Sequence, residues 1–135
     1  MKYRDLTQQD RELVAAASEA IRSNYVEGRH HVGAAVRARS GKIYAGVHME
    51  SPGLDVCAEW VALGMAVSAG EREFDCCVAV NRTGVMSPCG VCRELLHSYG
   101  PQMDVIVRDG EKLGKVAVTE LLPLPYAKAG PPTGA

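Results

Sequence analysis

Two short stretches with cysteines, Cys57-Ala58-Glu59 and Pro88-Cys89-Gly90-Val91-Cys92, stand at the starts of two predicted helices. Cys89 and Cys92 are three residues apart, so their thiols project from one face of the first turn of their helix. Cys57 opens the other helix. The three sulfurs converge if the two helix N-termini lie side by side at one edge of a sheet, and the pattern predicts a fold with that arrangement.

Helices and strands alternate along the rest of the chain. Apolar patterns and turn residues predict a helix over about 7–24, strands over 32–39 and 42–49, a helix over 57–69, a strand over 74–80, a helix over 89–99, a strand over 103–107 and a short strand over 116–118. The alternation after the first strand pair indicates parallel strands joined by crossover helices. We therefore expect an α/β fold with three layers, α/β/α, around a mixed sheet of about five strands. Residues 1–135 should form a single domain, with 127–135 as a disordered tail.

The composition argues against several classes of protein. The 135 residues carry a formal net charge of −1 and no run of lysine and arginine, which argues against nucleic acid as the main partner. No apolar stretch approaches the roughly 20 residues that span a bilayer, so we expect no membrane partner. Residues 1–5 lead into a polar helix and not a signal peptide, and we expect a cytoplasmic location. Five cysteines, an odd number, fit a disulfide framework poorly and are more typical of metal binding or catalysis.

Three of the cysteines and Glu59 have the chemistry of a catalytic zinc site. Helix N-termini carry partial positive charge and free N–H groups, which stabilise the thiolates that bind metals. Cys57, Cys89 and Cys92 would leave the fourth tetrahedral position of zinc to a water molecule, as in catalytic sites, and zinc acidifies that water. Glu59, two residues beyond Cys57, reaches this position and can transfer protons. The alternative is that the three cysteines are unconnected buried thiols.

The remaining cysteines and two histidines are expected to have no catalytic role. Cys76 and Cys77 are neighbours in a predicted strand, so their side chains face opposite ways and cannot chelate one metal together. His30 and His31 lie in a predicted loop and match no ligand spacing.

The order Cys-Ala-Glu and then Pro-Cys-x-x-Cys resembles the signature of the cytidine deaminase superfamily, in its small three-Cys zinc type. The resemblance extends from about Leu13 to Tyr126. It implies a hydrolase with one Zn²⁺ per subunit and with Glu59 as acid and base, not as a ligand, which converts cytidine or deoxycytidine to uridine or deoxyuridine plus ammonia. It further implies a small-molecule nucleoside substrate, a role in pyrimidine salvage, and a homotetramer with sites at subunit interfaces.

The resemblance also implies substrate contacts. Cytidine deaminases typically carry Asn-x-Glu at the end of the second strand, where both side chains bind ribose hydroxyls, and His48-Met49-Glu50 stands here. Glu50 carries over. His48 replaces the Asn and can still hydrogen-bond a hydroxyl, or it packs at the strand end. Tyr126 matches an aromatic position that stacks on the base or closes a neighbour's site, or it is a surface tyrosine in a loose tail.

Two departures from the cytidine deaminase pattern leave the substrate open. The loop that leads to Cys57 is two residues shorter than in typical cytidine deaminases, and this length is similar to that of blasticidin S deaminase. Blasticidin S deaminase lacks the Glu of Asn-x-Glu, however, whereas Glu50 is present here, so the sequence lies between the two types. Trp60 stands where three-Cys cytidine deaminases usually carry an Arg. Its indole either donates an uncharged hydrogen bond, with Arg93 partly compensating for the charge, or is a core residue.

Three hypotheses follow. The first is a cytidine or deoxycytidine deaminase. The second is a deaminase of another cytosine-containing compound, such as a blasticidin S-like aminonucleoside. The third is a zinc-binding protein without turnover, which would not need Glu59, so the presence of this residue disfavours it.

Overall fold

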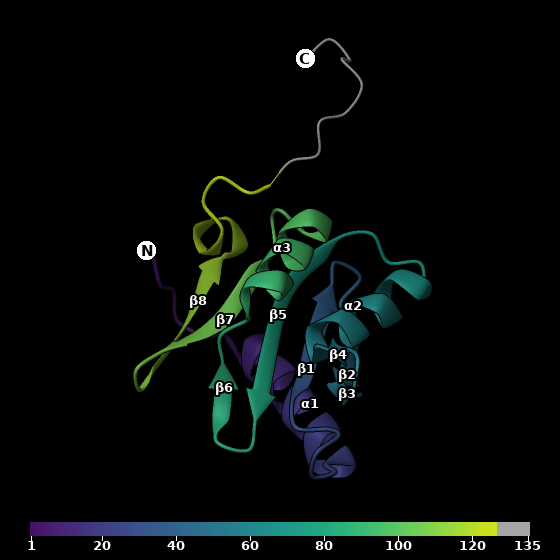
Figure 1. The fold of residues 1–135 in the computed structure, drawn as a ribbon. Helices are drawn as coiled ribbons and strands as arrows, with labels where there is room; N and C mark the ends of the chain where they lie inside the picture. The colour runs from purple at the N-terminus through teal and green to yellow at the C-terminus, as the bar shows by residue number, and fades with distance from the viewer. Residues whose placement is uncertain (127–135) are drawn as a thin grey trace, which may run out of the picture.

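The computed structural model describes residues 1–126, which form a mixed β-sheet covered by helices (Figure 1). The main sheet has the strand order β2-β1-β5-β7-β8, and β6 pairs with β5. Its strands are β1 (Gly33–Ala38), β2 (Ile43–Val47), β5 (Phe74–Asn81), β6 (Gly84–Met86), β7 (Asp104–Asp109) and β8 (Lys112–Ala117). The helices are α1 (Gln8–Asn24), α2 (Ala58–Ser68), α3 (Gly90–Tyr99) and the short 3-10 helix η1 (Val118–Leu121), and β3 (Met49–Glu50) and β4 (Asp55–Val56) form a small separate hairpin. The predicted tail, residues 127–135, lies outside the described residues.

The expected α/β/α fold with a mixed sheet is confirmed. β5 and β7 are parallel and are joined through α3, as the alternation of elements predicted, whereas β1 is antiparallel to both β2 and β5. The last strand of the sheet was predicted too short, over residues 116–118. β8 begins at Lys112 and not at residue 116, and it forms an antiparallel hairpin with β7 around Gly110, whose φ of 64° makes the tight turn possible.

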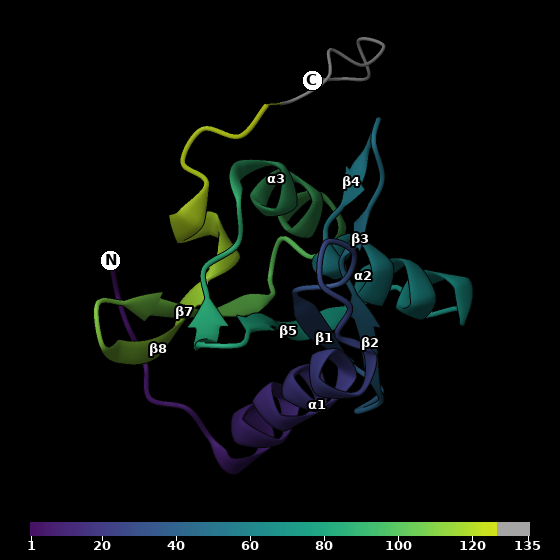
Figure 2. The same ribbon diagram turned by 60° about the horizontal axis from the view of Figure 1, so that its bottom comes forward.

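The two faces of the sheet bury separate cores. α1 lies against one face, and α2 and α3 lie against the other (Figure 2). Cys76 packs in the core beneath α1, and Cys77 packs in the core beneath α2 and α3. This matches the opposite orientations expected of strand neighbours. Among the described residues, no helix has both the length and the apolar character that a membrane span requires.

A buried ionic cluster ties α1 to the sheet. Asp10 closes a capping box with Thr7 at the start of α1 and is fully buried. Its carboxylate accepts hydrogen bonds from Arg37 of β1 at 3.2 Å and from Lys115 of β8 at 2.9 Å. One carboxylate therefore links the N-terminal helix to two strands that are not neighbours in the sheet.

Candidate active site

Three thiols meet where the N-termini of α2 and α3 lie together. Cys57 is the N-cap of α2 and Cys89 is the N-cap of α3, and their Sγ atoms are 3.8 Å apart. Cys92 follows in the first turn of α3 and is fully buried. The three Sγ atoms all lie within 4.8 Å of one another. The structure thus brings together the three cysteines that the sequence pattern singled out.

The spacing of these sulfurs suits zinc. Sulfurs at the usual Zn–S distance of about 2.3 Å from a tetrahedral centre are roughly 3.8 Å apart, and the Cys57–Cys89 distance has this value. Burial raises the pKa of the Cys89 thiol, but the backbone N–H of Cys92 and the other two thiols outweigh it and lower the pKa below its ordinary value. Burial instead raises the pKa of the Cys57 and Cys92 thiols above the ordinary value. Of the three thiols, Cys89 alone has the lowered pKa that the sequence led us to expect.

Glu59 is a buried carboxyl group in the first turn of α2. Its side chain is only 5% exposed, and burial is the main reason that its pKa lies above the ordinary value of a glutamate. A raised pKa brings a carboxyl group closer to the range in which it can both accept and return a proton near neutral pH.

A cavity of about 140 Å³ joins these groups. Glu59 and the three cysteines line it together with His48, and its other walls come from Val32, Ala58, Met86 and Ser87. The cavity wall thus carries three thiols, a carboxyl group and an imidazole.

His48 is held by its neighbours, although one of its nitrogens has no partner. Its backbone N–H donates to Val32 at 2.8 Å, and its carbonyl lies 2.8 Å from Nδ1 of His30. The Nδ1 atom of His48 is buried and has no hydrogen-bond partner among the described residues. A buried polar nitrogen without a partner is costly, so a ligand that fills the cavity and bonds it would relieve that cost.

Glu50 lies beside the cavity and not in its wall. It pairs with Asp55 across the β3–β4 hairpin, and the side chains of Glu50, Asp55 and His48 bring ligand atoms within 4.8 Å of one another. Glu50 and Asp55 line an open groove of about 450 Å³ with Arg29, whose guanidinium donates to the Glu50 carbonyl at 3.2 Å. The predicted pair His48 and Glu50 is therefore close together in space.

Tyr126 is not in the wall of the thiol cavity of its own chain. Its side chain is 76% exposed and lines a hollow of about 480 Å³ with Trp60 and Val91, over α2 and α3. A contact of Tyr126 with a substrate stays a prediction.

Residues 7–108 match the protein family described as "Cytidine and deoxycytidylate deaminase zinc-binding region". The chain belongs to the cytidine and deoxycytidylate deaminase family. It is a zinc-dependent deaminase, a hydrolase that acts on C–N bonds of cyclic amidines.

Known members of this deaminase family match almost the whole chain. A blasticidin-S deaminase of Bacillus cereus is 42% identical, over 95% of this chain and 99% of its own length. A cytidine deaminase of Sporosarcina psychrophila is 33% identical, over 86% of this chain and 90% of its own. The crystal structure of a cytidine deaminase from Burkholderia pseudomallei matches with a TM-score of 0.75 and 30% identity, and covers 90% of this chain and all of that one.

Trp60 follows Glu59 in α2, and Arg93 follows Cys92 in α3. Trp60 is 43% exposed, so the interpretation of it as a core residue is wrong, and it does not line the thiol cavity. Arg93 donates from Nε to the carbonyl of Pro88 at 2.9 Å and from Nη1 to that of Leu121 at 3.4 Å. Its guanidinium thus braces the segment that precedes Cys89.

The sequence alone missed several neighbours of the deaminase site. His30 and His31 match no ligand spacing, yet His30 holds the carbonyl of His48, and the rings of His31 and His48 lie 5.8 Å apart. Met86 and Ser87 belong to β6 and the residue after it, a strand that the sequence analysis did not predict. The Ser-Pro pair before Cys89 was the available signal for Ser87.

Proposed function

We propose that this chain removes the exocyclic amine of a cytosine ring by hydrolysis, with Cys57, Cys89 and Cys92 holding one zinc ion and Glu59 moving the protons. The observation that carries the proposal is the cavity in which the three thiols and the buried Glu59 carboxyl face one space. Zinc, when bound by three thiolates, supplies a water molecule that is acidic enough to act as a nucleophile near neutral pH.

Glu59 carries the proton through the reaction. Its carboxylate takes a proton from the attacking water and gives it to the ring nitrogen next to the reacting carbon. It then takes the second proton of the same water and delivers it to the departing amine. Water and a cytosine thus give a uracil and ammonia. The low exposure of Glu59 keeps bulk water from exchanging this proton during turnover.

His48 and Glu50 recognise the sugar of the substrate. Nδ1 of His48 has no partner, His48 lines the cavity, and a sugar hydroxyl next to the base is a group that can bond this atom. Glu50 and the neighbouring Asp55 add two carboxylates at the same rim. These carboxylates suit hydroxyls, and they also suit an ammonium group on the sugar.

A blasticidin S-like aminonucleoside is better supported as the substrate class than cytidine, the first hypothesis. The relative named for blasticidin S shares 42% identity over nearly the whole of both chains, against 33% for the cytidine deaminase. The short loop before Cys57 favours the same class. Glu50 is the feature that speaks for cytidine, because it matches the Glu of the cytidine deaminase Asn-x-Glu pattern.

Replacement of Glu59 tests the mechanism. Glu59→Gln keeps the size and polarity of the side chain, so zinc content should stay at that of the unsubstituted protein while turnover falls at least about hundredfold. Glu12→Gln, an exposed position on α1, is the matched control and should keep full activity. Unchanged turnover in Glu59→Gln would contradict the mechanism. No turnover in the unsubstituted, zinc-loaded protein would favour the zinc-binding hypothesis.

A substrate panel tests the specificity. Loss of the cytosine absorbance is followed for blasticidin S, cytidine and deoxycytidine, and kcat/KM is compared. We expect the highest value for blasticidin S. A higher value for cytidine would refute the assignment of the aminonucleoside and leave the deaminase mechanism intact.

The exposed apolar side chains on α2 and α3 support assembly with further copies of the chain. Trp60, Val91 and Tyr126 share one hollow, and Met65 on α2 is 49% exposed. We propose that this patch is one of the interfaces of a homotetramer, in which Tyr126 would lie next to a neighbour's site. Sedimentation should give a tetramer, and Trp60→Ser should shift it toward smaller species. A monomeric unsubstituted protein would refute the assembly.

A further inference from the structure

The strand end that carries His48 and Glu50 lies beyond the regular pairing of the main sheet. The register of β1 against β2 ends at the pair Gly33 and Val47. One further bond of this kind follows, from the backbone N–H of His48 to the carbonyl of Val32 at 2.8 Å. The main sheet alone therefore does not fix the two residues that we propose to recognise the sugar.

The loop before β1 completes the bonding of this strand end. Nδ1 of the His30 side chain lies 2.8 Å from the carbonyl oxygen of His48. The backbone N–H of Glu50 donates to the carbonyl of Arg29 at 3.1 Å, and Nη1 of Arg29 donates to the carbonyl of Glu50 at 3.2 Å. Residues 29–32 thus bond the backbone N–H and the carbonyl of both His48 and Glu50.

The side chain of His30 acts on the backbone of His48 and not on the cavity. A carbonyl oxygen only accepts, so Nδ1 of His30 carries the hydrogen and donates it. His30 is half-buried and is not part of the wall of the thiol cavity. An effect of His30 on a substrate in the cavity is therefore transmitted by the peptide group of His48.

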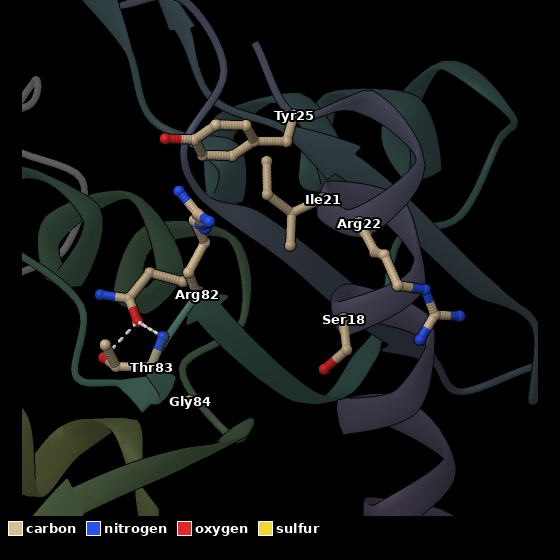
Figure 3. Close-up of a pocket in the computed structure, with 8 residues that line it drawn as sticks. Ser18, Ile21, Arg22, Tyr25, Arg82, Thr83 and Gly84 are labelled. Atoms are coloured by element: carbon tan, nitrogen blue, oxygen red, sulfur yellow. Dashed lines mark hydrogen bonds between the residues drawn. The ribbon is translucent and has the colours of Figure 1, made fainter. Parts of the chain in front are cut away.

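The imidazole ring of His48 is held by packing against the same loop. The ring centroids of His31 and His48 lie 5.8 Å apart, and Tyr25 stacks on His31 at 5.8 Å with an interplanar angle of 26°. The guanidinium carbon of Arg82 lies 4.6 Å from the centre of the Tyr25 ring, and Figure 3 shows these two side chains facing each other. The ring of His48 thus packs at the end of a row of side chains, while His30 holds the peptide that carries it.

We propose that His30 is a positioning residue for the substrate, whose Nδ1–H holds the His48 carbonyl so that the side chains of His48 and Glu50 meet the sugar together. The inference rests on the proposed function, in which these two side chains recognise the sugar. Within residues 1–126, Nδ1 of His48 is buried and has no hydrogen-bond partner. Its bond to a sugar hydroxyl depends on the place of the strand end, because hydrogen bonds weaken steeply when their geometry is bent or stretched.

Two substitutions of His30 isolate its hydrogen bond. His30→Ala removes the donor, whereas His30→Asn retains one, because the side-chain amide of asparagine also donates through N–H groups. We expect His30→Ala to raise KM for the preferred substrate about three- to tenfold with kcat nearly unchanged, and His30→Asn to recover most of this loss. Zinc content should stay at that of the unsubstituted protein in both variants, because His30 does not contact the thiols. An equal loss in kcat, or no recovery in His30→Asn, would overturn the proposal.

Two further variants control for the loss of an imidazole and for folding. His97→Ala removes a half-buried imidazole from the last turn of α3 and should change neither constant. His30→Leu keeps the bulk of the side chain and donates nothing, so it replaces His30→Ala in the comparison if thermal unfolding shows that the alanine variant is not folded at the assay temperature.

A double-mutant cycle shows whether His30 acts through the sugar contacts. The protein with His48→Ala and Glu50→Ala has lost both contacts, so adding His30→Ala should lower kcat/KM by less than about twofold further. The full effect of His30→Ala in this background would overturn the proposal, because His30 would then act by another route.

The single variants separate this inference from the function on which it rests. Raised KM in His48→Ala and Glu50→Ala, together with unchanged KM in His30→Ala, would overturn the positioning role and leave sugar recognition standing. Unchanged KM in His48→Ala and Glu50→Ala would refute sugar recognition by these residues and the positioning role with it.

Discussion

Cys57 and Cys89 occupy the same structural position, the N-cap, in two different helices, and their sulfurs lie 3.8 Å apart. An N-cap side chain sits beside the free N–H groups of the first turn, where negative charge is stabilised. Neither side chain forms a capping hydrogen bond with its own helix. Both sulfurs are therefore available to a metal, and two helix dipoles point at the place where it would lie.

Loss of one of these cysteines should abolish zinc binding. Cys89→Ser replaces a soft sulfur ligand with a hydroxyl that stays protonated near neutral pH, so the zinc content should fall from about one per chain to near zero. Elemental analysis of the purified protein measures this. Chelation of the unsubstituted protein should lower its melting temperature, because a ligand bound to the folded state stabilises it.

Cys76→Ala is the matched control for the zinc measurement. Cys76 is a buried thiol in the core beneath α1, so its loss should cost stability but no metal. Zinc retained by Cys89→Ser at the level of the control would contradict the three-thiol site.

Replacement of Glu50 should weaken substrate binding more than catalysis. Glu50 lies at the rim beside His48, away from the thiols, so Glu50→Ala should raise KM by roughly tenfold or more with a smaller effect on kcat. Steady-state kinetics on the preferred substrate measures both constants. Glu111→Ala, in the turn between β7 and β8, serves as the control. Full activity of Glu50→Ala would show that Glu50 does not recognise the sugar.

Patterns of residues close in sequence predicted the helix starts and strand faces that depend on local interactions. The helix starts at Cys57 and Cys89 and the opposite faces of Cys76 and Cys77 follow from residues close in sequence. The convergence of the three thiols also followed, because the α/β alternation brings helix N-termini to one edge of the sheet.

Contacts between distant segments could not be predicted in this way. His30 holds His48 from 18 residues away, and Asp10 meets Lys115 from 105 residues away. The hairpin of β3 and β4 has only two residues in each strand, too few for a pattern to be recognised. Trp60 fits the apolar pattern of α2, yet it faces outward, because only the packing of the whole fold decides which side of an apolar helix is covered.

The buried carboxylate of Asp10 should make stability depend on pH in the acid range. Burial acts to raise its pKa, but hydrogen bonds from Lys115 and Thr7 outweigh it and lower the pKa from 3.8 to about 2. A carboxyl group with a lowered pKa in the folded state stabilises the protein above the unfolded value, and this contribution is lost as the pH falls from about 4 to 2. The free energy of unfolding, measured with urea, should fall by about 2 kcal/mol over this pH range.

Asp10→Asn should remove this dependence of stability on acid pH. It should also lower the free energy of unfolding by about 3–5 kcal/mol at neutral pH. The large cost arises because Arg37 and Lys115, both mostly buried, lose their counter-charge. Asp5→Asn, at an exposed position before α1, is the control. An unchanged slope of stability against pH in Asp10→Asn would exclude Asp10 as its source.

Gly33 marks the closest approach of α1 to the sheet, and an added methyl group should separate them. A Cβ atom on Gly33 would lie 2.3 Å from the carbonyl oxygen of Ala17 and 3.0 Å from Cβ of Ile21, so the helix would have to move. Gly33→Ala should lower the free energy of unfolding by about 1–3 kcal/mol.

Gly64→Ala is the opposite case, because Gly64 lies in α2 with no atom within 4 Å of an added Cβ. There alanine should raise stability by about 0.5–1 kcal/mol, since it favours the helix. Stability loss in both glycine variants, or in neither, would contradict this account of the helix–sheet contact.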